Sequence, residues 1–399
     1  MALIAYADGV HTAALAPDAV AALAGVADPE VLLGWTPVAH PWLASDGLRG
    51  ATFLAGYSLA GAVRAGRLRY LPVRLSAVPA LLERLHPVVA VVPGCTRGGE
   101  LVFRGTVGIG PAAARAADAV VVEVDDGAPE NAGPAVPTLP IHGRVVATVA
   151  RDPAAALAPA PRPFEEAELA VARNVVAILP DEPTLQLGPG GIAEAIVASL
   201  ERPVRIWSGL LTEAMARLAE RGLLLGTATA GYTWGGEAVA RLARDGRLDL
   251  RPVEATHDLV AVSRIPRFVA CNTAVQVALD GSVNVERVGD RVIAGIGGHA
   301  DFSAAASRAA DGLSVVALRA TDRTGGSTIV ERVDAVSTPR CDVDVVVTEH
   351  GIADLRGADD RTRAARIAAV AAPGHRDRLL AAARIPSTAA PEPPRTHPG

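Results

Sequence analysis

Residues 343–357 read VDVVVTEHGIADLRG. The first five residues are rich in valine, which is typical of a strand buried on both faces of a parallel sheet. This strand ends abruptly at Thr348, Glu349 and His350, and a glycine follows. An acid and a histidine therefore lie at the C-terminal end of a buried strand. They are either a catalytic pair, the caps of a helix, or support for chemistry carried elsewhere.

Apolar runs of strand length alternate with Ala-rich helical stretches along most of the chain. The run VVAVVPG at 88–94 precedes GPAAARAADAVVVEVDD at 110–126, which indicates a helix followed by a strand, and LSVVALRA at 313–320 is another strand. Strands that alternate with helices favour parallel sheets with crossover helices. We therefore predict an α/β fold with two open, mostly parallel sheet domains that carry helices on both faces.

The length of the chain, 399 residues, suits two α/β domains better than one. Residues 127–163 are rich in Pro, Gly and Ala, which predicts a crossing or linker segment. We place the domains at 1–180 and 181–380. The polar, Pro-rich end of the chain, 381–399, is predicted to be a disordered tail.

The composition excludes several classes of function. All 38 basic residues are arginine, so neither a Schiff-base lysine nor a P-loop lysine is present. A formal charge of −5 provides no field that attracts nucleic acid or an anionic membrane. No apolar run approaches the roughly 18 residues that a membrane span needs. We expect neither nucleic acid nor membrane as a partner.

The three cysteines, Cys95, Cys271 and Cys341, lie far apart and show no metal-ligand spacing. Unpaired thiols in a chain of this length indicate a reducing compartment. The first residues carry an acid early and lack the basic start of a signal peptide. The sequence therefore predicts a cytoplasmic protein with no metal site.

The stretch LQLGPGGIAEAIVASL at 185–200 predicts a strand, a turn containing Gly188, Gly190 and Gly191, and a helix. Glycines allow backbone N–H groups to approach a ligand, and a helix N-terminus favours negative charge. The stretch also fits a loose dinucleotide fingerprint, but the next strand ends at Gly209 without the carboxylate that would hold a ribose. A tight turn without a ligand stays open as an alternative.

A second turn of this kind occurs in VIAGIGGHADFSAAASRAADG at 292–312, which contains Gly297, Gly298, His299 and Asp301. Asp301 alone is explained equally well as a helix cap, and His299 as a hydrogen-bonded loop residue. Two glycine-rich turns between strand and helix cluster at the carboxyl edge of an open sheet, where ligands bind. Together they predict one ligand site.

The order of these motifs resembles that of the acetyl-CoA hydrolase/transferase family, a branch of the class I coenzyme A transferases that includes 4-hydroxybutyrate/acetate CoA-transferases. The matching segments are LQLGPGGIAEAI, then FVACNTAVQVALDGSVNVERVG at 268–289, then GIGGHADF, then VVTEHGIADLRG. The family pattern T-E-x-G-I-A-D-L-R-G is the most specific of them, and the resemblance spans roughly residues 40–380. It implies that the two Gly-rich turns, Asn272, His299 and Asp301 bind the substrate.

The resemblance further implies CoA-transferase or acyl-CoA hydrolase activity, with a coenzyme A thioester as substrate rather than a tightly bound cofactor, a small carboxylic acid as partner and a possible homodimer. In the family a glutamate carboxylate attacks the thioester. In the matching stretch IWSGLLTEAMARLAERG at 206–222, Gly209 takes that position. Glu213 is a displaced substitute, which we expect about 6 Å further along a helix, one full turn. Glu349 is implied to lie in the wall of the site, where it orients the substrate or acts as a general base.

Three hypotheses follow from the sequence. The first is a CoA-transferase or acyl-CoA hydrolase with altered catalytic groups, in which Glu349 and Glu213 are the candidate acids. The second is a catalytically silent protein that binds acyl-CoA. The third, a dinucleotide-dependent enzyme, is the most distant.

Overall fold

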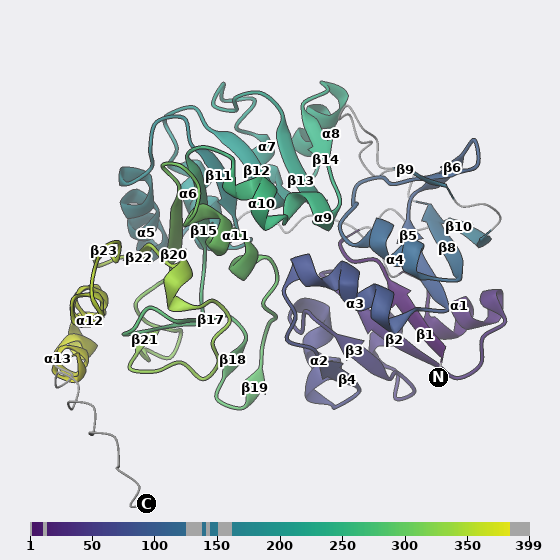
Figure 1. Cartoon of the computed structure of the whole chain (residues 1–399), viewed down its shortest axis with the longest axis horizontal. Coiled ribbons are helices and arrows are strands. Elements are labelled where there is room, and N and C mark those ends of the chain that lie inside the picture. Colours follow the sequence, from purple (N-terminus) through teal and green to yellow (C-terminus); the bar gives the residue numbers. More distant parts are fainter. Residues whose placement is uncertain (1, 11–13, 125–137, 141–143, 151–161, 384–399) are drawn as a thin grey trace, which may run out of the picture.

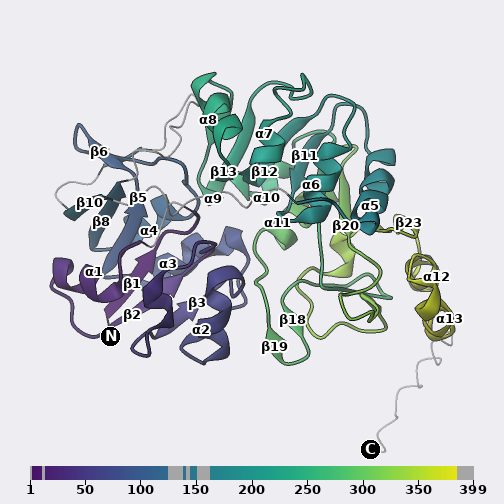
Figure 2. The same ribbon diagram turned by 180° about the vertical axis from the view of Figure 1, so that it is seen from behind.

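The structure is a computed structural model of the whole chain, and it describes residues 2–10, 14–124, 138–140, 144–150 and 162–383. Two α/β domains lie side by side, each built on its own large sheet (Figures 1 and 2). The predicted α/β class with mostly parallel sheets is confirmed.

The first sheet has seven strands, all parallel, in the order β10-β8-β5-β1-β2-β3-β4. Its strands are β1 (Ala2–Tyr6), β2 (Pro29–Leu33), β3 (Gly50–Thr52), β4 (Leu68–Tyr70), β5 (Val89–Pro93), β8 (Ala119–Val124) and β10 (Val145–Ala150), and its helices are α1 (Pro17–Ala24), α2 (Ala60–Arg64), α3 (Val78–Leu85) and α4 (Gly110–Ala116). Alternate residues of β1 enter different cores: Ile4 packs with Val20 of α1, and Ala5 with Val78 of α3. Helices therefore cover both faces of this sheet.

The second sheet has eight strands in the order β14-β13-β12-β11-β15-β20-β22-β23, and β22–β23 is its one antiparallel pair. Its strands are β11 (Thr184–Leu187), β12 (Arg205–Thr212), β13 (Ala228–Trp234), β14 (Leu248–Leu250), β15 (Phe268–Asn272), β20 (Leu313–Ala317), β22 (Val345–Thr348) and β23 (Gly351–Asp354). The helices of this half are α5 (Glu166–Ala177), α6 (Gly191–Ala198), α7 (Glu213–Ala216), α8 (Glu237–Arg244), α9 (Val253–Thr256), α10 (Leu259–Ser263), α11 (His299–Ala306), α12 (Asp360–Ala369) and α13 (Pro373–Ala382). None of the helices in the described parts of the chain combines the length and apolar character that a membrane crossing needs.

Three small sheets complete the fold. They are β6 (Cys95–Arg97) with β7 (Glu100–Val102) and β9 (Thr138–Pro140), β16 (Gln276–Ala278) with β17 (Val283–Asn284) and β21 (Ile329–Val330), and the hairpin of β18 (Arg287–Val288) and β19 (Arg291–Val292). The buried core is built mainly from Val, Leu and Ala. Such small side chains let helices approach the sheets closely.

Several segments differ from the sequence-based expectation. The expected linker at 127–163 contains β9 and the edge strand β10, which pairs with β8 because its valines and alanines suit a strand. Helix α5 precedes the expected domain boundary at 180, yet it packs on α6 and β22 of the second sheet. In the predicted tail 381–399, residues 381–382 end α13, and 384–399 lie outside the described residues.

The strand that was expected to end at Gly209 continues to Thr212 as β12. Leu210 and Leu211 pair with Tyr232 and Thr233 of β13, and both leucines are buried. Burial of these apolar side chains in the sheet outweighs the helical pattern that follows them, because local propensity is weaker than tertiary packing. Gly209 therefore lies inside a strand rather than at a junction with a helix.

Candidate active site

A cavity of about 360 Å³ lies where the carboxyl edges of the two large sheets face each other. Residues that follow β1, β2 and β3 line it from the first domain, and residues at or after the ends of β11 and β15 line it from the second. The lining includes Asp8, Trp35, Leu54, Tyr57, Gly188, Gly209, Tyr232, His257, Asn272, Gly298, His299 and Phe302. The wall is largely apolar with a few polar groups, as in most small-molecule sites.

Both glycine-rich turns predicted from the sequence reach this one cavity. Gly188 lines it after β11, and Gly297 and Gly298 line it before α11. A Cβ at position 298 would lie only 2.5 Å from Nε2 of His257, so the close approach requires glycine there. Gly190 and Gly191 instead line the neighbouring cavities.

Asn272 lies at the end of β15 and forms a reciprocal amide pair with Gln186 of β11. Asn272 Nδ2 donates to Gln186 Oε1 at 2.8 Å, and Gln186 Nε2 donates to Asn272 Oδ1 at 3.1 Å. Both side chains are buried and both line the cavity. The pair holds the two strand ends together beside Gly188.

His299 and Asp301 lie in the first turn of α11, and their side chains have different hydrogen-bond partners. His299 Nδ1 lies 2.7 Å from the Thr338 hydroxyl, and burial lowers its pKa to about 4, so the ring is neutral at pH 7. Its Nε2 is buried and has no hydrogen-bond partner among the described residues. Asp301 does not cap its own helix, because its carboxylate accepts hydrogen bonds from the Ser76 hydroxyl at 2.6 Å and the Ser76 N–H at 3.1 Å. It therefore joins the two domains.

Glu349 lies in the two-residue turn between β22 and β23 and does not line the cavity. Its Oε2 accepts the backbone N–H of Ala320 at 2.8 Å, and its Oε1 lies 3.8 Å from His350 Nε2. The Thr348 hydroxyl accepts the N–H of His350 at 3.0 Å, which stabilises this turn. The resemblance implied that Glu349 lies in the wall of the site. In the structure, Glu349 instead supports the loop after β20.

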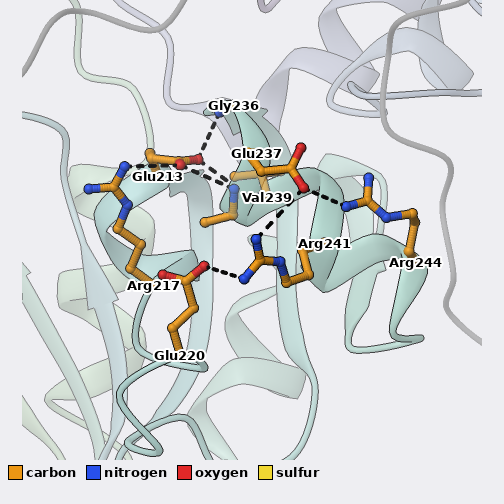
Figure 3. A network of polar contacts seen from close by, with 9 residues as sticks. Glu213, Arg217, Glu220, Gly236, Glu237, Val239, Arg241 and Arg244 are labelled. Carbon is orange, nitrogen blue, oxygen red and sulfur yellow. Dashed lines mark hydrogen bonds and ion pairs between the residues drawn. The ribbon is translucent and has the colours of Figure 1, made fainter.

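Glu213 caps a helix other than its own. Its carboxylate accepts the N–H groups of Gly236, Ala238 and Val239 at 2.7, 3.1 and 3.4 Å, at the start of α8 (Figure 3). Burial raises the pKa of Glu213, but these N–H groups and Arg217 outweigh it and hold the pKa below its ordinary value. Four residues of strand separate it from Gly209 by about 13 Å, rather than the 6 Å expected for a helix. Glu213 does not line the 360 Å³ cavity.

His257 is a site residue that the sequence analysis missed. It follows α9, lines the cavity and packs its ring on Phe302 with the ring centres 4.4 Å apart. Burial lowers its pKa to about 3, so the ring is neutral. A Cβ at position 209 would lie 3.3 Å from His257 Nε2 and Cε1. No local motif marks His257; only the tertiary structure brings it to Gly209.

Asp8 is the second residue that was missed. It follows β1 and is fully buried, and its carboxylate accepts the Tyr232 hydroxyl at 2.9 Å and the Ile109 N–H at 3.3 Å. Burial raises the pKa of Asp8 to about 6, although both hydrogen bonds oppose this shift. Its position after the first strand of a parallel sheet is the signal that points to it.

Two further cavities adjoin the first. One of about 840 Å³ shares Tyr57 and Pro189 with it. Its lining includes the basic side chains of Arg162, Arg217 and Arg221 and the acidic ones of Glu194 and Glu213. The other, of about 220 Å³, shares Gly188 and Pro189 with it and contains Arg319 and Arg323. Arginine side chains around a helix N-terminus at Gly191 favour phosphate groups.

The two-domain fold is shared with solved structures. RipA from Yersinia pestis superposes with a TM-score of 0.83 at 22% identity, covering 96% of this chain and 93% of that one. A 4-hydroxybutyrate CoA-transferase from Porphyromonas gingivalis gives 0.73 at 23% identity, covering 95% and 92%. At these identities the likeness shows the fold, which is that of CoA-transferases.

The sequence comparisons define the family. Residues 237–383 match the model described as the acetyl-CoA hydrolase/transferase C-terminal domain. A succinyl-CoA:cyclohexane-1-carboxylate CoA transferase from Geobacter metallireducens is 30% identical, covering 81% of this chain and 77% of the relative. An acetyl-CoA hydrolase from Eremothecium gossypii is 28% identical, covering 80% and 72%. The chain belongs to the acetyl-CoA hydrolase/transferase family, as its motifs predict.

Proposed function

We propose that the chain binds an acyl-CoA between its two domains and acts on the thioester, as a CoA-transferase or as an acyl-CoA hydrolase. The observation that carries this proposal is the single cavity shared by Gly188, Gly209 and Gly298, at the facing edges of the two sheets. Relatives named as CoA-transferases and as acetyl-CoA hydrolases support both activities.

In this proposal the thioester lies at Gly209, and the nucleotide part of the ligand lies in the adjoining cavities. Among the described residues, the backbone N–H of Gly298 has no hydrogen-bond partner, and it borders the cavity. It is a suitable donor for the oxyanion that forms when a thioester is attacked. Arg162, Arg217 and Arg221 would meet the phosphates of coenzyme A. A cytoplasmic location, a small carboxylic acid as second substrate and a homodimer belong to the same proposal.

A catalytically silent acyl-CoA-binding protein is the second candidate. It is favoured by the absence of a side chain at Gly209, together with the use of Glu213 and Glu349 as acceptors for backbone N–H groups. Neither carboxylate is directed at the cavity that the turns share.

Two measurements on the purified protein test the proposal. Calorimetric titration with acetyl-CoA should show saturable binding, and titration with NAD should show none. Release of free thiol from acetyl-CoA, with and without succinate, then separates hydrolysis from transfer. Binding without thiol release and without exchange supports the silent protein, and no binding at all contradicts both.

A further inference from the structure

Nε2 of His257 is the polar atom nearest to the position that a Cβ at residue 209 would occupy. We propose that His257 is the catalytic base of this site, that its Nε2 activates a water molecule for attack on the thioester, and that the chain is therefore an acyl-CoA hydrolase rather than a CoA-transferase. This inference rests on the proposed binding of acyl-CoA in the cavity.

The imidazole ring is held in place from several sides. Its Nδ1 lies 2.8 Å from the Thr256 hydroxyl, which in turn lies 3.3 Å from the Pro252 carbonyl oxygen. When the Thr256 hydroxyl donates to Pro252, Nδ1 must carry the ring proton and donate to Thr256, which leaves Nε2 with its lone pair. Phe302 packs on the ring, and Trp207 Nε1 donates to the Thr256 carbonyl oxygen at 3.1 Å.

His257, Gly209 and Gly298 line the same cavity, and glycine at both positions keeps side chains away from Nε2. A Cβ at Gly298 would lie 2.5 Å from Nε2, and one at Gly209 would lie 3.3 Å from it. Nε2 has no hydrogen-bond partner among the described residues. A side chain at position 209 would project toward this atom, so its absence leaves room there for water. The N–H of Gly298, which has no hydrogen-bond partner among the described residues, is the donor that we assign to the oxyanion.

The reaction balances without a further reagent. Nε2 takes one proton from water as the water oxygen bonds to the thioester carbonyl carbon, and the carbonyl oxygen becomes an oxyanion. When this intermediate collapses, the C–S bond breaks and the imidazolium returns the proton to the thiolate sulfur. The products are the carboxylic acid and free coenzyme A. Burial keeps the ring neutral before the reaction, and the adjacent oxyanion stabilises the imidazolium while it exists.

His257→Gln tests this assignment against His86→Gln, which changes a surface histidine that is paired with Asp118. The probe is acetyl-CoA, and kcat, KM and calorimetric affinity are measured for each variant. We expect His257→Gln to lower kcat about 100-fold or more, since a positioned base contributes about 10²–10⁴, with affinity within a few-fold of wild type. His86→Gln should leave kcat unchanged. If His257→Gln does not bind acetyl-CoA, His257→Ala with added imidazole replaces it, and recovery of thiol release is expected.

Turnover in ¹⁸O-labelled water identifies the attacking group. Direct attack by water leaves the mass of the intact protein unchanged after many turnovers. Label in the carboxylate of Asp8, Glu213 or Glu349 would show an acyl-enzyme on that residue and overturn the role of His257. Unchanged kcat in His257→Gln, no rescue by imidazole, or acetyl-CoA binding without hydrolysis by wild type would each overturn it too, with the proposed binding intact. Absence of binding by wild type would overturn the proposed function itself.

Discussion

Asp8 shows what burial does to one carboxyl group at the domain interface. Its pKa of about 6 in the folded chain lies above the ordinary value near 4. Protonation therefore favours the folded state, so this contribution to stability is full below about pH 4 and is lost as the pH rises through 6. The hydrogen bond from the Tyr232 hydroxyl stabilises the charged carboxylate, so it reduces this loss of stability without removing it.

Asp8→Asn should remove this dependence, because the amide does not titrate. Between pH 4 and pH 7 we expect the free energy of unfolding of wild type to fall by about 2–3 kcal/mol more than that of Asp8→Asn. Denaturant unfolding of both proteins at the two pH values measures the difference. Parallel curves for the two proteins would show that Asp8 keeps an ordinary pKa.

At the scale of single elements, Glu213 links two short helices by accepting three N–H groups at the start of α8. Glu213→Ala leaves those donors without their acceptor and should lower the free energy of unfolding by about 1–3 kcal/mol. Glu220→Ala is the matched control, because Glu220 makes only an exposed ion pair with Arg241 at 3.0 Å (Figure 3). Its loss should cost about 0.5 kcal/mol or less. Equal losses in urea unfolding would mean that Glu213 does not cap α8.

Strand β12 carries the second prediction at this scale. Gly209 has no positive φ, so a side chain is compatible with the backbone, and the His257 ring must shift by only a few tenths of an ångström. Gly209→Glu should raise exchange between acetyl-CoA and succinate at least about tenfold, because an ionised carboxylate then lies beside the thioester. Gly209→Gln is the control. Equal exchange in wild type and both variants, with intact circular dichroism, would show that the cavity does not support transfer.

At the scale of the whole molecule, the two domains are joined through polar contacts that each involve a buried carboxylate. Besides Asp8 and Tyr232, Tyr70 donates to Glu286 at 2.6 Å, and Ser76 donates twice to Asp301. Asp8 and Tyr232 line the cavity, and so do Leu75 and Val285, which are adjacent in sequence to Ser76 and Glu286. A site between domains needs such contacts, because neither sheet forms the cavity alone.

Ser76→Ala tests the strength of this junction. The Asp301 carboxylate would lose its hydroxyl donor while it stays buried, which should lower the free energy of unfolding by about 1–3 kcal/mol. Ser45→Ala is the control, since the exposed Ser45 hydroxyl only accepts the Gly47 N–H at 3.3 Å. Thermal unfolding of the two variants measures both effects. A loss no larger than that of Ser45→Ala would contradict the role of Asp301 in joining the domains.

The sequence by itself determined the α/β class, the family and the two glycine-rich turns, because strand and turn patterns are local and the motifs are contiguous. It did not determine that β12 continues past Gly209, since Leu210 and Leu211 are apolar in either element and only their pairing with β13 decides.

The tertiary structure alone decided which acids face the cavity. Glu213 and Glu349 are turned to backbone N–H groups of neighbouring elements, and those donors lie at least 20 residues away in sequence. His257 and Asp8 reach the cavity from segments that carry no motif. The physical reason is that an active site forms where strand ends from distant parts of the chain converge, and local sequence does not record which side chains meet there.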